Sequence, residues 1–244
     1  MILRSRWLNL WGSSPLLEFS PRYCWRRFSK EKEKVQPIRC AGNLHQQGVA
    51  LHVFLADNHG YPTLYANKND GYPDHGRSWI AQLEQVGFGS FQPQTNYFKQ
   101  EIWLCPSAKW TTKVLGDPPC YYGLNCGSFD QSDPNYTNRL GLGGRYSRIS
   151  HTFVPITESE VLAPGDMMAI GDSFDGTIVL SRAILNELEG YGNALTRHRG
   201  HANVVICDVH VESPTLQFLF EDTSDAALVR WNRDHRPHRE KLSP

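Results

Sequence analysis

Side chains in the second half of the chain are of types that could perform chemistry. Ser173, in the sequence Gly171-Asp172-Ser173, could serve as a nucleophile. Asp208 and His210 would then complete a Ser-His-Asp triad, in which the histidine accepts the proton of the serine hydroxyl. A triad depends on geometry that spacing alone does not supply, and no alternation of strands and helices surrounds Ser173. A serine hydrolase therefore stays an alternative, beside a tight turn at residues 171–173.

Histidines near the carboxyl end could bind a transition metal. His198 and His201 form a His-x-x-His pair, and Asp208 and His210 form an Asp-x-His pair. Three imidazole nitrogens and one carboxylate oxygen suit zinc. On a strand, Asp208 and His210 would point the same way, while the two other histidines lie in the preceding loop. Such histidines also commonly bond to water or to the backbone, so a metal- or glycan-binding module remains a further alternative.

Asp166, Asp172 and Asp175 are close enough in sequence to bind calcium together with loop carbonyls. The stretch lacks the acidic density of an EF-hand loop, so turn and capping roles compete with this interpretation. No glycine-rich phosphate loop is present. We therefore expect no enzymatic activity and no cofactor, with calcium as the one exception to consider.

Composition limits the class of protein. The 244 residues contain 25 Lys and Arg against 25 Asp and Glu, and 40% of them are hydrophobic. The chain can build a sizeable core, and its zero net charge argues against a dedicated nucleic-acid binder. It contains no run of 18 apolar residues, so the sequence as it stands predicts no membrane span and a soluble protein.

The cysteines do not form a recognisable motif. There are six of them and no Cys-x-x-Cys pair, which argues against a zinc ribbon or a thioredoxin-like site. Three disulfides are permitted in fifteen pairings, and buried free thiols are the competing interpretation. The six are Cys24, Cys40, Cys105, Cys120, Cys126 and Cys207.

The spacing of apolar residues predicts one well-defined helix over residues 38–58. Its apolar positions step by three or four residues and so share one face; they are Cys40, Leu44, Gly48, Leu51 and Leu55. Pro37 stands where a missing N–H costs little, and Gly60 suits a left-handed end.

The remaining elements are predicted to be short. We expect a helix over residues 78–86 and a helical turn capped by Thr157. Strands are expected at 102–106, 120–125, 153–156, 167–170 and 202–207, the last forming a hairpin with 210–213. One long helix followed by short strands indicates an α+β fold.

The sequence divides into three parts. Residues 1–36 carry eight Lys and Arg against three Glu, and we expect an atypical basic segment that lacks fixed structure or is not genuine. Residues 37–229 would form the globular domain, and residues 230–244 a basic tail.

Residues 197–212 resemble the carboxy-terminal "His, nine residues, Asp-Gly" motif of prepilin-type, type II secretion pseudopilin-like proteins. His198 and Asp208 have the required separation, and Asn203 lies between them. Val209 replaces the glycine of the motif. Since a left-handed turn is costly for valine, we expect the hairpin to use another turn type.

Six further blocks are similar to this family in the same order. They lie at residues 39–51, 56–62, 104–107, 122–125, 168–173 and 230–235. The residues that match landmarks of the family, beyond His198, Asn203 and Asp208, are Cys40, Asn43, Leu44, Cys105, Pro106, Gly171 and Asp172.

The resemblance implies a pilin-like fold, with one long N-terminal helix packed on a small antiparallel sheet with long loops. It implies a structural subunit that assembles with like pseudopilin subunits or secretion-system components at the periplasmic face of the inner membrane. It also implies a hydrogen bond from His198 to Asp208 and a disulfide between Cys40 and Cys105. Residues 1–28 stand where the family has a cleavage site and an apolar anchor, which suggests a frameshift, a misplaced start or a degenerate paralogue.

Overall fold

The structure is a computed structural model. It describes residues 21–64, 78–87, 101–109, 120–128, 139–147, 149–150, 152–173, 175–180, 185–186, 189 and 192–242. Residues 1–20 of the predicted basic segment lie outside the described residues. The helices are α1 (Pro21–Asn58), α2 (Ser78–Gly87), α4 (Leu216–Phe220) and α5 (Asp225–Leu228). The strands are β1 (Cys120–Ser128), β2 (Arg145–Ser147), β3 (Thr152–Val154), β4 (Met168–Asp172), β5 (Asp175–Leu180), β6 (Val204–Ile206) and β7 (Val211–Glu212). Short 3-10 helices are η2 (Glu101–Trp103), η3 (Glu158–Glu160), η4 (Arg197–Arg199), η5 (Val229–Trp231) and η6 (Arg239–Lys241).

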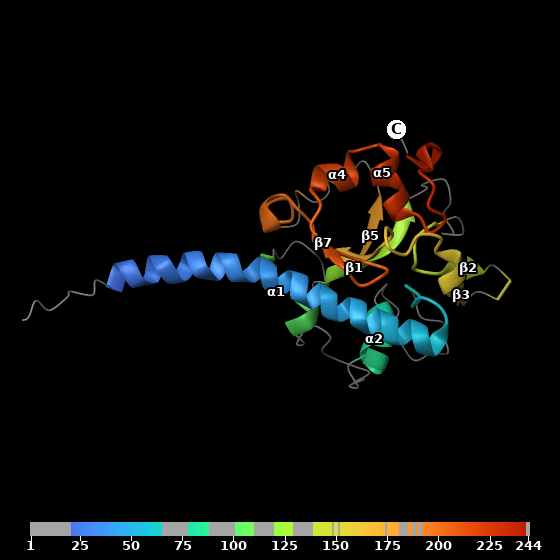
Figure 1. Cartoon of the computed structure of the whole chain (residues 1–244), viewed down its shortest axis with the longest axis horizontal. Helices are drawn as coiled ribbons and strands as arrows, with labels where there is room; N and C mark the ends of the chain where they lie inside the picture. The colour runs from blue at the N-terminus through green and yellow to red at the C-terminus, as the bar shows by residue number, and fades with distance from the viewer. Residues whose placement is uncertain are drawn as a thin grey trace, which may run out of the picture.

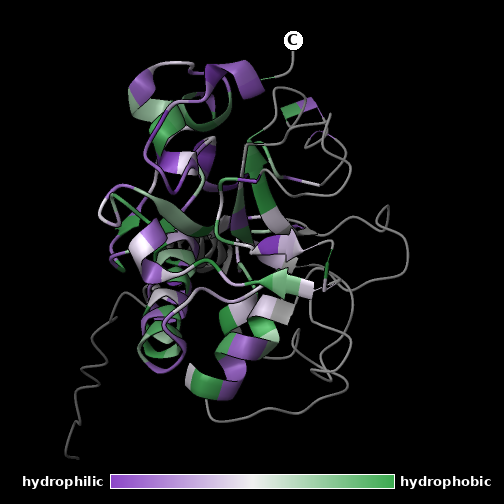
Figure 2. Cartoon of the chain, turned by 90° about the vertical axis from the view of Figure 1, so that its right-hand side faces the viewer, coloured by the Kyte–Doolittle hydropathy of each residue, from purple (hydrophilic) through white to green (hydrophobic). Residues whose placement is uncertain are grey.

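Helix α1 is the longest element described, and the apolar stripe predicted from the spacing of its residues is confirmed. All five residues of the predicted apolar stripe are buried. In Figure 2, where α1 is seen nearly end-on, hydrophobic and hydrophilic residues both occur along it, as an amphipathic helix requires. Gly48 brings the helix close to the sheet, because a Cβ there would lie 2.7 Å from Val205 Cγ2.

Helix α1 starts earlier than predicted, and the residue at its left-handed end is not the predicted one. The helix begins at Pro21, inside the segment assigned to residues 1–36, and continues through Pro37. A proline in a helix interior costs about 3 kcal/mol, so the sequence alone favoured a start there. At the carboxyl end the left-handed residue is His59, with φ 52°, rather than Gly60.

The main sheet is mixed, and the prediction of a purely antiparallel sheet is wrong. Its five strands run in the order β5-β1-β4-β6-β7. The pairs β1–β4, β4–β6 and β6–β7 are antiparallel, whereas the edge strand β5 pairs with β1 in parallel. β2 and β3 form a separate two-stranded sheet. The α+β class is confirmed.

The main sheet separates two cores. On one face, buried side chains of α1 and α2 pack with Ile170 and Val205. On the other face, Met168, Val204 and Ile206 pack with α4, α5 and η5. Figure 1 shows these elements on opposite sides of the sheet. The side chains of β6 alternate between the two cores, as the pleat of a strand requires.

Several short elements were predicted correctly and one was not. The helix α2 covers the predicted residues 78–86, and Thr157 caps η3 in a capping box with Glu160. Residues 102–106, predicted as a strand, instead form η2 and a turn. Their backbone bonds to α1, since the Gln47 side chain donates from Nε2 to the Ile102 carbonyl over 2.9 Å.

The carboxyl end packs into the body. Trp231 is buried in the core that α4 and α5 cover. Arg230 donates to both carboxylate oxygens of Glu212 and also to Asp166. The part of the predicted tail that the structure describes therefore contributes to the globular domain.

The β6–β7 hairpin keeps a left-handed turn despite valine. Val209 has φ 80°, although we expected another turn type. Its N–H donates to the Ile206 carbonyl over 2.9 Å, and its side chain lies near Gly48 of α1. A β-branched residue with positive φ is strained.

We predict that Val209→Gly is more stable than Val209→Ala by about 1 kcal/mol, because only glycine relieves the left-handed strain. Both variants lose the packing of valine on α1, so the comparison isolates the backbone. Urea unfolding measures the difference. At Val211, which lacks a positive φ, the same pair should show the usual order with alanine more stable; alanine ahead of glycine at both positions would contradict the strain.

Glu84 is a buried carboxyl in α2. Only 2% of it is exposed, and it accepts a hydrogen bond from Trp103 Nε1 over 2.7 Å. Burial raises its pKa to about 7, although the Trp103 bond favours the charged form. The folded state therefore binds this proton more tightly than the unfolded chain does.

Glu84→Gln should keep the Trp103 bond and remove the cost of the buried charge. The raised pKa of Glu84 contributes fully to the free energy of unfolding at pH values below 4.5, the pKa of this carboxyl in the unfolded chain. This contribution is lost as the pH rises toward about 7, the pKa in the folded protein. We expect equal stability of variant and wild type at pH 4 and a variant more stable by about 3 kcal/mol at pH 8. Chemical denaturation at both pH values tests this, and a constant difference would refute it.

Candidate functional site

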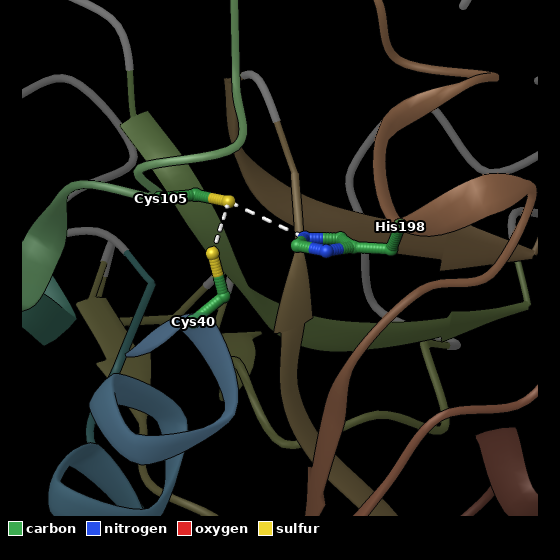
Figure 3. A group of neighbouring side chains, drawn as sticks. All are labelled: Cys40, Cys105 and His198. Carbon is green, nitrogen blue, oxygen red and sulfur yellow. Dashed lines mark hydrogen bonds between the residues drawn. The ribbon is translucent and has the colours of Figure 1, made fainter. Parts of the chain in front are cut away.

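Three side chains from distant segments converge at the amino end of the globular body. Cys40 lies on α1, Cys105 in the turn after η2, and His198 in η4. The two sulfurs are 2.9 Å apart, and Cys105 Sγ lies 3.3 Å from His198 Nε2. Figure 3 shows the two thiols pointing toward each other and the imidazole edge facing Cys105. Among the described residues, these three form the one group of His, Cys and acidic side chains close enough to share a metal ion.

Asp172 lies directly behind the histidine. Its Oδ2 is 3.3 Å from His198 Nε2, and its Oδ1 is 3.7 Å from Arg197 Nη2. The side chains of all three are at most 4% exposed. Asn203 adds its backbone N–H over 2.7 Å and its side-chain amide over 3.3 Å, both donated to Oδ2. A carboxylate is thus buried between two basic side chains and two amide donors.

These contacts set the charges of the carboxyl and the imidazole. Burial favours the neutral form of Asp172, but Arg197 and His198 outweigh it and hold the pKa of the carboxyl below its usual value. Burial likewise disfavours the charged imidazole, and the contacts with Asp172 and Cys40 raise the pKa of His198 to about 9. Without a bound ion, the pair is therefore ionised at neutral pH.

The pKa values of the two thiols are shifted in opposite directions. The hydrogen bond from Cys105 lowers the pKa of Cys40 to about 5, against the effect of burial. The same bond, together with burial, raises the pKa of Cys105. The directions of the two pKa shifts favour Cys40 as the thiolate and Cys105 as the donor. A thiolate is the form of cysteine that attacks electrophiles and binds metals.

The segments around the site are fixed to one another by polar side chains. Asn43 on α1 donates from Nδ2 to the Leu104 carbonyl over 3.0 Å. Asn193 accepts from the N–H of Lys109 over 2.6 Å and donates to the Ser107 carbonyl over 2.9 Å. Helix α1, the turn that carries Cys105 and the loop before η4 are held together without involving the thiols.

The backbone at the histidine is unusual. His198, Arg199 and Gly200 have successive positive φ values of 55°, 60° and 78°. Left-handed conformations cost about 1 kcal/mol or more for residues with a Cβ, and such strain concentrates at functional sites. At Gly171, a Cβ would lie 2.9 Å from Val204 Cγ1, so glycine permits β4 and β6 to approach beside Asp172.

The structure brings together several residues that the sequence analysis named for the family resemblance. Cys40, Cys105, Asp172, His198 and Asn203 meet at this site. Of the other named residues, Asn43 holds the Cys105 turn, Leu44 is fully buried on α1 and Pro106 follows Cys105. Both cysteines are free thiols, so the expected disulfide does not form.

The predicted hydrogen bond between His198 and Asp208 is wrong. His198 contacts Asp172 and Cys105, while Asp208 is exposed and pairs with His210. Spacing in the motif suggested a contact across the hairpin, but the left-handed turn at His198 directs its ring to the end of β4 instead.

The residues predicted to bind zinc are not gathered at one place, and two of the three predicted calcium ligands pair with basic side chains. Of the four residues proposed for zinc, His198 lies in the buried site, His201 bonds through Nδ1 with the Arg199 carbonyl, and His210 lies between Asp208 and Glu212. Of the calcium set, Asp166 pairs with Arg230, and Asp172 pairs with Arg197 and His198. The Asp175 side chain lies outside the described residues.

The alternative triad is not assembled either. The Ser173 hydroxyl is buried and donates to the Thr177 carbonyl over 2.6 Å. Both ring nitrogens of His210 are engaged by acidic side chains at the surface. The residue that sequence reasoning missed is Arg197, because in the run Arg197-His198-Arg199 it looks like one of several exposed basic side chains.

Comparison of the chain with protein-family models, with curated proteins and with solved structures finds no match. Among the helices that the structure describes, none combines the length and the apolar character needed to cross a membrane. The function must therefore be argued from the geometry of this chain.

We predict that Asp172→Ala destabilises the protein by about 3–5 kcal/mol, since it leaves Arg197 and His198 buried without their counter-charge. Asp208→Ala is the matched control, because its pair with His210 is exposed and should contribute less than about 1 kcal/mol. Urea unfolding of both variants provides the measurement. Similar losses in the two variants would show that the buried carboxylate is not a central contact.

Proposed function

We propose that this protein is a non-enzymatic structural subunit that resembles a pseudopilin and assembles with like subunits through α1. The observation that supports this most directly is the shape of α1. The helix has 38 residues, but its described buried side chains begin at Cys40. Figure 1 shows its amino-terminal half projecting from the body. A projecting helix on a compact head is what a subunit needs to pack against neighbouring helices.

The exposed side of α1 carries a narrow apolar stripe. Val35, Ile38, Val49 and Val53 are 49%, 72%, 47% and 41% exposed. At 100° per residue they fall within about 60° of one another. Gly42 lies on the same side and has open space where a Cβ would stand, so another helix could approach closely there. Spacings of three, four and seven residues are those of helix–helix seams.

The buried site favours a structural role. Its charged and sulfur side chains pair with one another inside the protein, and they join α1 to the sheet. The resemblance of the motif at residues 197–212 is a second support for a pseudopilin-like subunit. The occupants of the α1 stripe would be like subunits or secretion-system components, and the proposed place is the periplasmic face of the inner membrane.

Self-association of the full chain tests the proposal. In sedimentation equilibrium we expect concentration-dependent association of the wild type. The double variant Ile38→Asp/Val49→Asp should weaken it at least tenfold, because two charges would be buried in the seam. Tenfold corresponds to about 1.4 kcal/mol.

Val154→Asp is the matched control, since Val154 is 42% exposed on β3 and is not part of the stripe on α1. It should associate like the wild type. Circular dichroism of all three proteins checks that they fold. A monomeric wild type at high concentration, or equal weakening in both variants, would contradict assembly through α1.

A further inference from the structure

We propose that Cys40, Cys105 and His198 bind a zinc ion, with the carboxylate of Asp172 as the fourth ligand. This inference does not rest on the proposed function. The predicted zinc set shares only His198 with it. The site is assigned from three-dimensional convergence, since its ligands are 65 residues apart in one case and 93 in another.

The ligand types suit zinc. Two thiolates, one imidazole and one carboxylate are all common zinc ligands, and the ion prefers four of them in a tetrahedron. Calcium and magnesium prefer oxygen ligands only. Two sulfurs select a softer ion, and the added nitrogen and oxygen complete a four-coordinate zinc shell.

Three distances between ligand atoms can be compared with those of a zinc tetrahedron. With ordinary zinc bond lengths, the ligand atoms should be about 3.8 Å apart for two sulfurs, 3.5 Å for sulfur and nitrogen, and 3.3 Å for nitrogen and oxygen. The corresponding distances are 2.9 Å, 3.3 Å and 3.3 Å. The two sulfurs must separate, and the Asp172 carboxylate must move toward them, because it lies outside the group of three side chains whose ligand atoms are all within 4.8 Å of one another.

The orientation of the ring is also suitable. His198 Nε2 faces both Cys105 and Asp172, so it is the nitrogen that would bind the ion. Asp172 Oδ2, the carboxylate oxygen that faces Nε2, would be the ligand atom, while Oδ1 faces the guanidinium of Arg197 at 3.7 Å.

Zinc would also balance the buried charge. Two thiolates and one carboxylate carry three negative charges, and zinc together with Arg197 carries three positive charges. A neutral cluster costs much less to bury than an uncompensated one. The amide groups of Asn203 would orient the carboxylate ligand, as residues around metal sites usually do.

The role of such a site would be structural. All four ligand side chains are buried, and four protein ligands leave no position for a substrate. The ion would connect α1, the turn after η2, η4 and the end of β4, the same segments that polar side chains already hold together.

Cobalt substitution of the reduced full chain tests this proposal, because Co²⁺ in a tetrahedral site with thiolate ligands has strong visible and charge-transfer absorption. We expect one zinc per chain by native mass spectrometry, and a cobalt spectrum typical of two thiolates. Cys105→Ser should abolish the spectrum, and Asp172→Asn should weaken zinc binding at least tenfold. Cys126→Ser is the matched control, since Cys126 is equally buried but outside the site, and it should bind like the wild type.

The variant His198→Cys distinguishes the loss of a metal ligand from the loss of folding, because it replaces one metal ligand with another. It offers a third thiolate, so binding should persist with increased charge-transfer absorption. The proposal is overturned if the wild type binds no metal while its thiols are free, if Cys40 and Cys105 are found oxidised to a disulfide that excludes metal, or if Cys105→Ser and Cys126→Ser bind equally.

Discussion

The carboxylate of Asp172 is the constraint on which the arrangement of the molecule depends. Its side chain is 2% exposed, and an isolated charge at such a place would cost several kcal/mol. Arg197, His198 and Asn203 remove that cost, but only when the loop before β6 lies over the end of β4. The left-handed backbone at His198 is a consequence, because no extended conformation at that residue would bring both neighbouring basic side chains to one carboxylate. The strain is thereby offset by electrostatic pairing.

A chain of side-chain contacts connects Asp172 to helix α1. β4 is the middle strand of the main sheet, with one core on each face. His198 connects the end of β4 to Cys105, and Cys105 connects to Cys40 on α1. Gln47 and Asn43 fix the same turn to α1 through backbone carbonyls. The helix is therefore held by apolar packing along its buried face and by directional polar contacts, including a hydrogen bond between His52 Nε2 and the Cys207 carbonyl over 2.7 Å.

The spacing of apolar residues and the types of capping residues correctly predicted those features that depend on local interactions. The buried face of α1 and the cap at Thr157 follow from spacing and side-chain type, and both are confirmed. Pro37 and Gly60 were given too much weight as helix boundaries, because α1 continues through the proline and its left-handed residue is His59. The parallel pairing of β5 with β1 joins segments that are far apart in the sequence, so no turn motif between adjacent strands could predict it. The residues of the buried site other than Arg197 were named from the sequence as landmarks of the family resemblance, but only Cys40 and Cys105 were expected to meet. Their convergence depends on chain crossings that spacing cannot reveal, and Arg197 had no signal apart from its basic neighbours.

The position of the buried site relative to α1 bears on how a projecting helix is used. Cys40 is the first buried residue described on α1, so the cluster lies where the helix leaves the body. A load applied to the projecting half acts first on that junction, and apolar packing alone resists sliding poorly because it has little directionality. Hydrogen bonds and ion pairs with fixed geometry resist it better, and a metal bond would resist it further. The buried polar groups at this junction would suit the proposed role of α1 in contacts between subunits.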